Sequence, residues 1–148
     1  RVPLPVTANG KAGLATLPLE EAMRIAREEG LPSPGRFGPR AIQSIEALAA
    51  ALDETRARGW GMSYEEAERG IAAIAAPIRP SGPNTPAVAT CSVAGPVMRF
   101  GADDIVRHAS LVMQAANEIA AIWPLRSAQT ERDLAVASQL RDEIAVAL

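Results

Sequence analysis

The sequence contains 148 residues, of which 48% are hydrophobic and only 3% are aromatic. This length corresponds to about one domain, whose core must be built from aliphatic side chains and alanine rather than from packed rings. A formal net charge of −2 at pH 7, with Lys11 as the single lysine, excludes the clustered basic surface that neutralises nucleic-acid phosphates. Nucleic acid is therefore not expected as a direct partner of this chain.

The cysteine content and the hydropathy pattern bear on the compartment. Cys91 is the single cysteine, so no internal disulfide is possible, and a cytoplasmic location is favoured. No signal-peptide pattern opens the chain and no apolar run is long enough to cross a bilayer, so no membrane is expected. Because the chain begins at Arg1 rather than at methionine, we expect a fragment or a processed product.

The first expected element is a short helix over residues 8–17. Thr7 precedes it as a suitable N-cap, because a threonine hydroxyl accepts a hydrogen bond from the first turn. Gly10 and Gly13 lower the helix propensity but allow another backbone to approach closely. The helix is therefore predicted to make a close contact.

Two further helices are expected before the strands. One runs from Pro18 to Gly30, with an apolar face of Leu19, Ala22, Met23 and Ala26. After a loop rich in glycine and proline, Ser44 caps a helix over residues 45–58 that ends at Gly59. The expected buried face of this last helix consists of Leu48, Leu52 and Thr55.

The stretch "GIAAIAAPI", residues 70–78, predicts a strand over residues 71–79. Large and small apolar side chains alternate in it, and Pro77 excludes a helix interior. A second strand is expected at 87–94 and should pair with the first in an antiparallel manner, after a short extended piece at "WGM". The small positions are nearly all alanine, which fits either close packing of helices on the sheet or the wall of a pocket.

The C-terminal part is expected to be helical. A continuous apolar stripe predicts a helix over about 102–122, which Pro124 ends. After Thr130 an i, i+4 apolar row predicts another helix, packed on the body or on another subunit. Two or three strands make a poor sheet alone, so further strands are expected to come from outside this sequence.

Residues suited to catalysis are scarce. One histidine and one cysteine exclude the usual zinc or iron sites, and no cofactor is expected. Cys91 has only His108 as a possible base, and both are better explained as packing residues. "NGKAG" lacks the spacing of a phosphate loop, and Glu65, Glu66 and Glu68 are expected on a solvated turn. No catalytic or metal-binding residue is therefore predicted.

A small binding site is better supported than catalysis. If Thr7 caps a helix, the N–H groups of Ala8, Asn9 and Gly10 point outward at its start and suit a carboxylate. On the second strand, Ser92 lies on one face with Thr90 and Ala94, so that two hydroxyls sit beside small side chains. These features describe a small pocket with few polar groups.

Three segments, "LPVTANGKAGLA", "ARGWGMSYEEAERGIAAIAAPI" and "SVAGPVMRF", together resemble the C-terminal effector-binding domain of the IclR family of bacterial transcription regulators. The resemblance runs from about Pro5 to Ile122. It implies an α+β domain with a curved antiparallel sheet flanked by helices, related to GAF and profilin-like folds and here incomplete at its N-terminus. It also implies a small organic acid as effector, a homodimer or homotetramer, and DNA binding through an N-terminal winged helix-turn-helix that this sequence lacks.

The resemblance implies a role for particular positions. The helix-start pair that approaches the ligand carboxylate falls on Ala8 and Asn9, and a cavity wall position falls on Ala73. A position that is often aspartate falls on Ser63, which alternatively forms a capping box with Glu66. Two positions that often carry hydroxyls fall on Ser92 and Ala94, so that this sequence has lost a charge at Ser63 and a hydroxyl at Ala94.

The sequence thus predicts a non-enzymatic, ligand-sensing and oligomerising domain over residues 1–122, with a helical extension at 123–148. The expected ligand-binding residues are Ala8, Asn9, Gly10, Ser63, Ala73, Ser92 and Ala94. Two alternatives stay open: a structural dimerisation module whose pocket is vestigial, and a Cys91-dependent enzyme.

Overall fold

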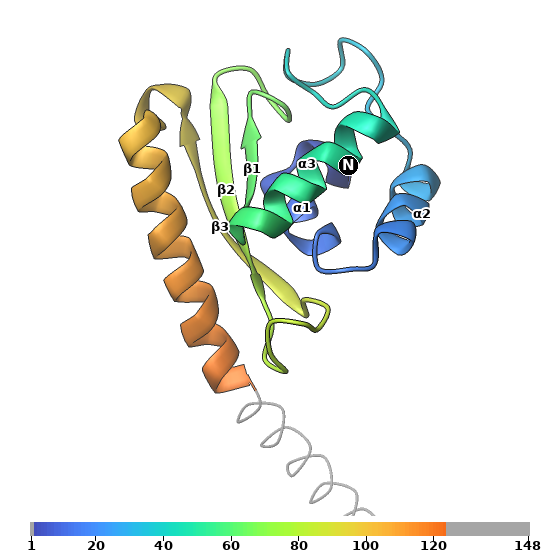
Figure 1. The fold of residues 1–148 in the computed structure, drawn as a ribbon. Coiled ribbons are helices and arrows are strands. Elements are labelled where there is room, and N and C mark those ends of the chain that lie inside the picture. The colour runs from blue at the N-terminus through green and yellow to red at the C-terminus, as the bar shows by residue number, and fades with distance from the viewer. Residues whose placement is uncertain (1, 124–148) are drawn as a thin grey trace, which may run out of the picture.

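A computed structural model of the protein describes residues 2–123 (Figure 1). The elements in chain order are the 3-10 helix η1 (Leu4–Val6), α1 (Ala8–Leu14), α2 (Leu19–Glu29), α3 (Ile45–Arg58), β1 (Gly61–Tyr64), β2 (Ile71–Ile78), β3 (Ala89–Pro96) and the 3-10 helix η2 (Val97–Arg99). A further helix covers residues 102–123 and is called the C-terminal helix below. The helix expected after Thr130, and with it the extension at 123–148 except for its first residue, lies outside the described residues.

The start of α1 confirms the predicted cap. The Thr7 hydroxyl oxygen accepts a hydrogen bond from the Gly10 N–H at 2.9 Å. The helix ends at Leu14 and is shorter than expected, because Thr16 and Leu17 bond back to carbonyls three residues earlier in tighter turns. Pro18 lies outside α2 as its N-cap residue, and Gly30 follows the helix as predicted.

The faces of α2 and α3 are largely as expected. In α2, Ala22, Met23 and Ala26 are buried, but Leu19 at the first position is 44% exposed. In α3 the Ser44 hydroxyl caps Ala47 N–H at 3.1 Å, and the left-handed Gly59 ends the helix at a φ of 84°. The residues Leu48, Leu52 and Thr55 form the buried face of α3.

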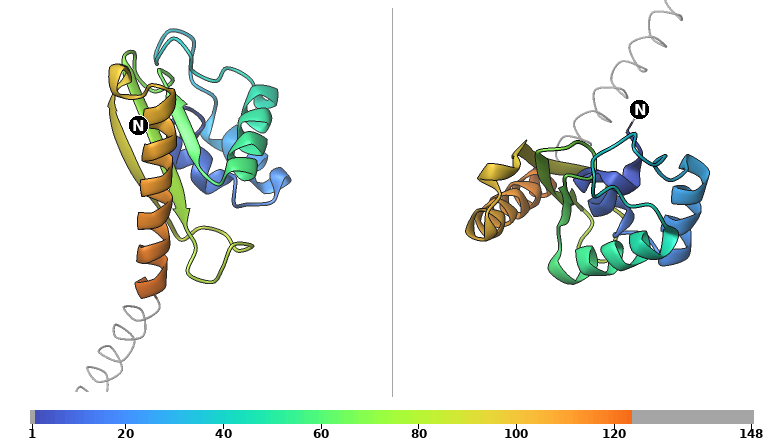
Figure 2. Two further views of the ribbon diagram at one scale, coloured as in Figure 1. Left: turned by 60° about the vertical axis from the view of Figure 1, so that its left-hand side comes forward. Right: turned by 90° about the horizontal axis from the view of Figure 1, so that it is seen from above.

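The three strands form one antiparallel sheet in the order β1–β2–β3. The strand expected at 71–79 ends at Ile78, and the one expected at 87–94 is displaced to Ala89–Pro96. Helices α1, α2 and α3 lie on one side of the sheet and the C-terminal helix lies on the other (Figures 1 and 2). The α+β class is therefore confirmed. No helix within residues 2–123 is both long enough and apolar enough to cross a membrane.

The side chains of strand β2 differ in size between the two faces of the sheet. Ile74 and Ile78, with Ala72 and Ala76, pack into two clusters that include residues of the C-terminal helix. On the other face, Ala75 and the partly buried Ala73 pack against α1. The large side chains therefore face the C-terminal helix, and the small ones face α1.

Helix α1 approaches β1 so closely that a side chain would not fit between them. A Cβ atom added at Gly61 would lie 2.6 Å from the Ala8 carbonyl oxygen and 2.8 Å from the Ala12 nitrogen. On the other side of α1, a Cβ atom at Gly10 would lie 2.1 Å from the Leu4 carbonyl oxygen of η1. Two glycines thus allow the backbone of α1 to pack between η1 and the sheet.

The two glycines of α1 offer a matched test of this packing. Gly10→Ala should lower the free energy of unfolding by about 1–3 kcal/mol, because the added methyl overlaps the η1 backbone. Gly13→Ala should be neutral or raise it by up to about 1 kcal/mol, since its Cβ would meet only the Thr90 methyl at 4.0 Å. Urea denaturation of both variants measures the difference, and equal effects would contradict the packing argument.

Candidate functional site

The predicted strand residues come together on the sheet face beneath α1. Ser63 of β1 is the register partner of Ala73 of β2, and Ala73 in turn is the partner of Ala94 of β3. Ser92 lies one pleat further along β3, opposite Ala75. Side chains alternate between the faces of a sheet, so this register places Ser63, Ala73, Ala94 and Ser92 on one face. We call this face the effector face.

The effector face is covered at one side and open at the other. Ser63 is 4% exposed beneath the start of α1, and Ala73 in the middle strand is partly buried. Ser92 and Ala94 are exposed, because β3 is an edge strand of the sheet and no described element covers this part of it. Polar and small groups are thus accessible at the β3 side only.

The start of α1 contributes backbone donors beside this face. Ala8 is buried against Ala75, while Asn9 is exposed. The Gly10 N–H is already bonded to Thr7, so the N–H groups of Ala8 and Asn9 are the ones without an intrahelical acceptor. Because α1 has seven residues, local N–H groups rather than a long helix dipole determine the electrostatics here.

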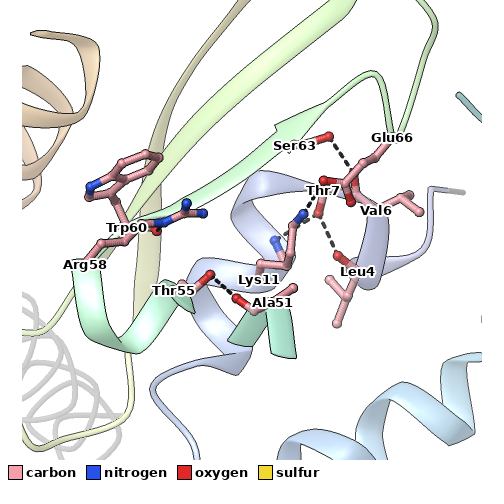
Figure 3. Close-up of polar contacts among 11 residues, drawn as sticks. Leu4, Val6, Thr7, Lys11, Ala51, Thr55, Arg58, Trp60, Ser63 and Glu66 are labelled. Atoms are coloured by element: carbon pink, nitrogen blue, oxygen red, sulfur yellow. Dashed lines mark hydrogen bonds and ion pairs between the residues drawn. The ribbon is translucent and has the colours of Figure 1, made fainter. Parts of the chain in front are cut away.

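Ser63 has a structural role that the sequence did not predict. Its hydroxyl donates a hydrogen bond to the Val6 carbonyl oxygen at 2.7 Å and so fixes η1 to β1 (Figure 3). The capping-box interpretation is wrong, because Ser63 lies within β1 and residues 65–70 form bends and turns instead of a helix. The Ser63 hydroxyl therefore donates its proton to the protein backbone and is not available as a hydrogen-bond donor to a ligand.

A buried ion pair lies at the β1 side of α1. The Lys11 Nζ atom is 2.5 Å from the Glu66 Oε1 atom, with 4% and 13% of the two side chains exposed (Figure 3). The expectation that Glu66 lies on a solvated turn is wrong. The turn around Glu66 is held by the loop after α2, since Gly38 N–H donates to the Glu66 carbonyl oxygen at 2.9 Å. The sequence indicated this ion pair only through the position of its single lysine, Lys11, between Gly10 and Gly13 of a helix predicted to make a close contact.

Burial dominates the electrostatics of this pair. It lowers the pKa of Lys11 and raises the pKa of Glu66, although their mutual attraction opposes both shifts. The Glu66 Oε2 atom is buried and has no hydrogen-bond partner among the described residues. Nearby, the Arg58 guanidinium lies over the Trp60 ring at 4.0 Å and donates to the Trp60 carbonyl oxygen at 2.8 Å. Its positive charge also disfavours protonated Lys11.

Cys91 and His108 occupy structural positions. Cys91 lies on the opposite face of β3 and packs with residues of the C-terminal helix. The His108 ring stacks on Phe100 with centroids 4.9 Å apart, and its Nδ1 atom is 2.6 Å from the Asp104 carbonyl oxygen. Within residues 2–123, no group of three or more His, Cys, Asp or Glu side chains could hold a metal ion.

An α+β fold with a small-residue face beneath a capped helix is a scaffold suited to binding a small molecule. The sequence matches the family "Bacterial transcriptional regulator IclR C-terminal" over residues 1–121, and the chain belongs to this family. Among curated relatives, it is 33% identical over 126 residues to the transcriptional repressor AllR of Klebsiella pneumoniae and 34% identical over 121 residues to the regulator KdgR of Escherichia coli. These matches cover 85% and 82% of this chain, but only 44% of each relative.

Solved structures agree with this assignment. The C-terminal domain of E. coli KdgR superposes with a TM-score of 0.69 at 32% identity, covering 80% of this chain and 69% of that one. The inducer-binding domain of PobR from Acinetobacter, crystallised with 3-hydroxybenzoic acid, has a TM-score of 0.70 at 26% identity, covering 82% and 67% of the two chains. The chain is thus an IclR-type effector-binding domain. Members of this family are transcription regulators that bind small-molecule effectors and DNA, and they are not enzymes.

The buried ion pair can be tested by replacing one partner or both. Lys11→Met alone should lower the free energy of unfolding by about 3–5 kcal/mol, because it leaves the Glu66 carboxylate buried without its cation. The double variant Lys11→Met/Glu66→Leu should recover most of this loss. As a control, Arg24→Met removes an exposed i, i+4 pair with Glu28 and should change little. Additive losses in a urea double-mutant cycle would contradict a coupled pair.

The raised pKa of Glu66 predicts a pH dependence. The folded state holds the Glu66 proton more tightly than the unfolded state, so this contribution to stability is complete below the ordinary pKa of 4.5. It is lost as the pH rises through the folded-state pKa. The stability of the wild type relative to Glu66→Gln, as measured by urea denaturation, should therefore fall as the pH rises above the ordinary pKa of about 4.5. A relative stability that rises with pH would mean that Lys11 lowers the pKa of Glu66 instead.

Proposed function

We propose that this domain senses a small organic acid, aliphatic or aromatic, on the effector face. The observation that carries the proposal is that Ser63, Ala73 and Ala94, from three strands, lie in one register row. The row runs from beneath the start of α1 at Ser63 to the exposed β3 side at Ala94, with Ser92 one pleat away. The N–H groups of Ala8 and Asn9 are the donors for the carboxylate, and Asn9 adds its exposed side-chain amide. The relative with 3-hydroxybenzoic acid in its inducer-binding domain supports an acid of this class.

The mechanism proposed for the full-length regulator is a shift between two conformations of different DNA affinity. An effector shifts this equilibrium only by its differential affinity for the two states. The proposal includes a winged helix-turn-helix elsewhere in the full-length protein, a homodimer or homotetramer, and a cytoplasmic location. In this scheme residues 1–122 sense the ligand.

The second candidate function is a structural dimerisation module with a vestigial pocket. Two observations favour it: the Ser63 hydroxyl already donates to Val6, and Ala94 has no hydroxyl to offer. Fewer polar partners mean a weaker carboxylate site, or one that takes a more apolar ligand.

Calorimetric titration of the intact regulator with aliphatic and aromatic carboxylates separates the two functions. Saturable binding is expected, and Ser92→Trp should abolish it because the indole fills the open side of the effector face. As a matched control on the same face, Ser63→Ala should lower the free energy of unfolding by about 1–3 kcal/mol through the unpaired Val6 carbonyl, while the affinity changes little. Operator binding that is intact in Ser92→Trp, together with no binding of any carboxylate to the wild type, would establish the structural module.

A further inference from the structure

A cavity lies at the far end of α1 from the effector residues. It has a volume of about 550 Å³ and is formed by the end of α1, the end of α3 and the segment that connects β2 to β3. None of the seven residues predicted to bind the effector lines it. Its volume is in the range of about 300–1,000 Å³ that is common for small-molecule sites. The cavity is therefore large enough for a ligand of its own.

The charged side chains that line this cavity have one sign. Arg56 of α3 and Arg79, which follows β2, both line it, whereas no Asp or Glu does. Arg56 is held in place by the α1 end, since its Nε and Nη2 atoms donate to the Ala15 and Leu17 carbonyl oxygens at 3.0 and 3.1 Å. Its Nη1 atom pairs with Asp53, which offsets part of its charge. The lining nevertheless favours an anion.

Arg79 is the cation with the greater remaining capacity. Its described partner is the Pro83 carbonyl oxygen, and a guanidinium has five N–H donors. The Asn84 side chain, which is exposed, adds an amide to the same cavity. These groups suit the two oxygens of a carboxylate, which accept bidentate hydrogen bonds from arginine.

The remaining wall is apolar and stiff. Leu17, Pro18, Pro77 and Pro86 line the cavity, and the prolines have fixed φ angles and no N–H groups. The connecting segment is also tied to α1, because Ala87 N–H donates to the Thr16 hydroxyl oxygen at 3.0 Å. A wall that is ordered before binding reduces the entropy cost of binding a ligand.

We propose that this cavity, which we call the arginine cleft, is a second ligand site for a small carboxylate with an apolar body. It is distinct from the effector face but adjoins the same helix, α1. A ligand in the arginine cleft and a ligand on the effector face would therefore both contact the surroundings of α1. If binding at one site changes the affinity of the other, the effect is reciprocal. The site goes beyond the proposed function, because it does not require the effector face to bind anything.

The test is an amide NMR titration of the intact regulator with benzoate as the probe and benzamide as its neutral isostere. The regulator carries Ser92→Trp, which blocks the effector face. Benzoate should shift the signals of Thr16 and Asn84 in a saturable manner, and benzamide should bind about tenfold more weakly. Arg79→Gln should weaken benzoate binding by about tenfold, whereas Arg79→Lys, which keeps the charge, should weaken it less.

Three results would overturn the proposal. They are no saturable shift at Thr16 and Asn84 with benzoate up to about 10 mM, equal binding of benzamide, and unchanged binding in Arg79→Gln. Arg79 is half-buried and its described side-chain partner is a single carbonyl oxygen of the same segment, so its replacement should leave the dispersed amide spectrum intact, which the same experiment verifies. Asn84→Trp, which fills the cleft without changing its charge, gives an independent check and should also abolish the shift at Thr16.

Discussion

The close contact between α1 and the sheet is the constraint on which the rest of the structure depends. Gly61 has no side chain where the α1 backbone passes over β1. Its register partner on β2, Ala75, has only a methyl group and packs against Ala8 and Ala12 of α1. The helix must lie at this distance, because Gly10 also places it against the η1 backbone on its other side. Everything that α1 carries, including Ala8, Asn9 and Lys11, is positioned by this contact.

Polar contacts then fix the direction of the helix over the sheet. The Ser63 hydroxyl holds the carbonyl of Val6 before α1, and the Lys11–Glu66 pair holds its β1 side. Just after the other end, the Thr16 hydroxyl accepts from the Ala87 N–H, and Arg56 donates to the Ala15 and Leu17 carbonyl oxygens. Each contact joins segments that are distant in sequence, so α1 is fixed mainly by tertiary contacts, as expected for a helix of two turns.

Local signals in the sequence predicted the local structure well. Caps at Thr7 and Ser44, the stop at Gly59 and the alternation in β2 each depend on residues within one turn or one strand. The failures concern long-range partners: Ser63 satisfies a carbonyl 57 positions away, and Glu66 pairs with a lysine 55 positions away. Spacing contains no information on such pairs. The alternation of strand residues predicted that Ser92 and Ala94 share a face, but the sequence could not tell that Ser63 is buried and that Ser92 is exposed.

The alanines of β2 therefore have two explanations, which apply to different positions. Ala75 is fully buried directly beneath α1, so its small size is required by packing and leaves no room for a ligand. Ala73 packs at the margin of the contact with α1 and is only partly buried, and its neighbour Ala94 on β3 is exposed. In the proposed function, a ligand on the effector face would therefore lie toward β3, beside Ala73, Ser92 and Ala94. β3 is the outer strand of the described sheet, and its unpaired edge lies at this same side, where a further strand could pair with it.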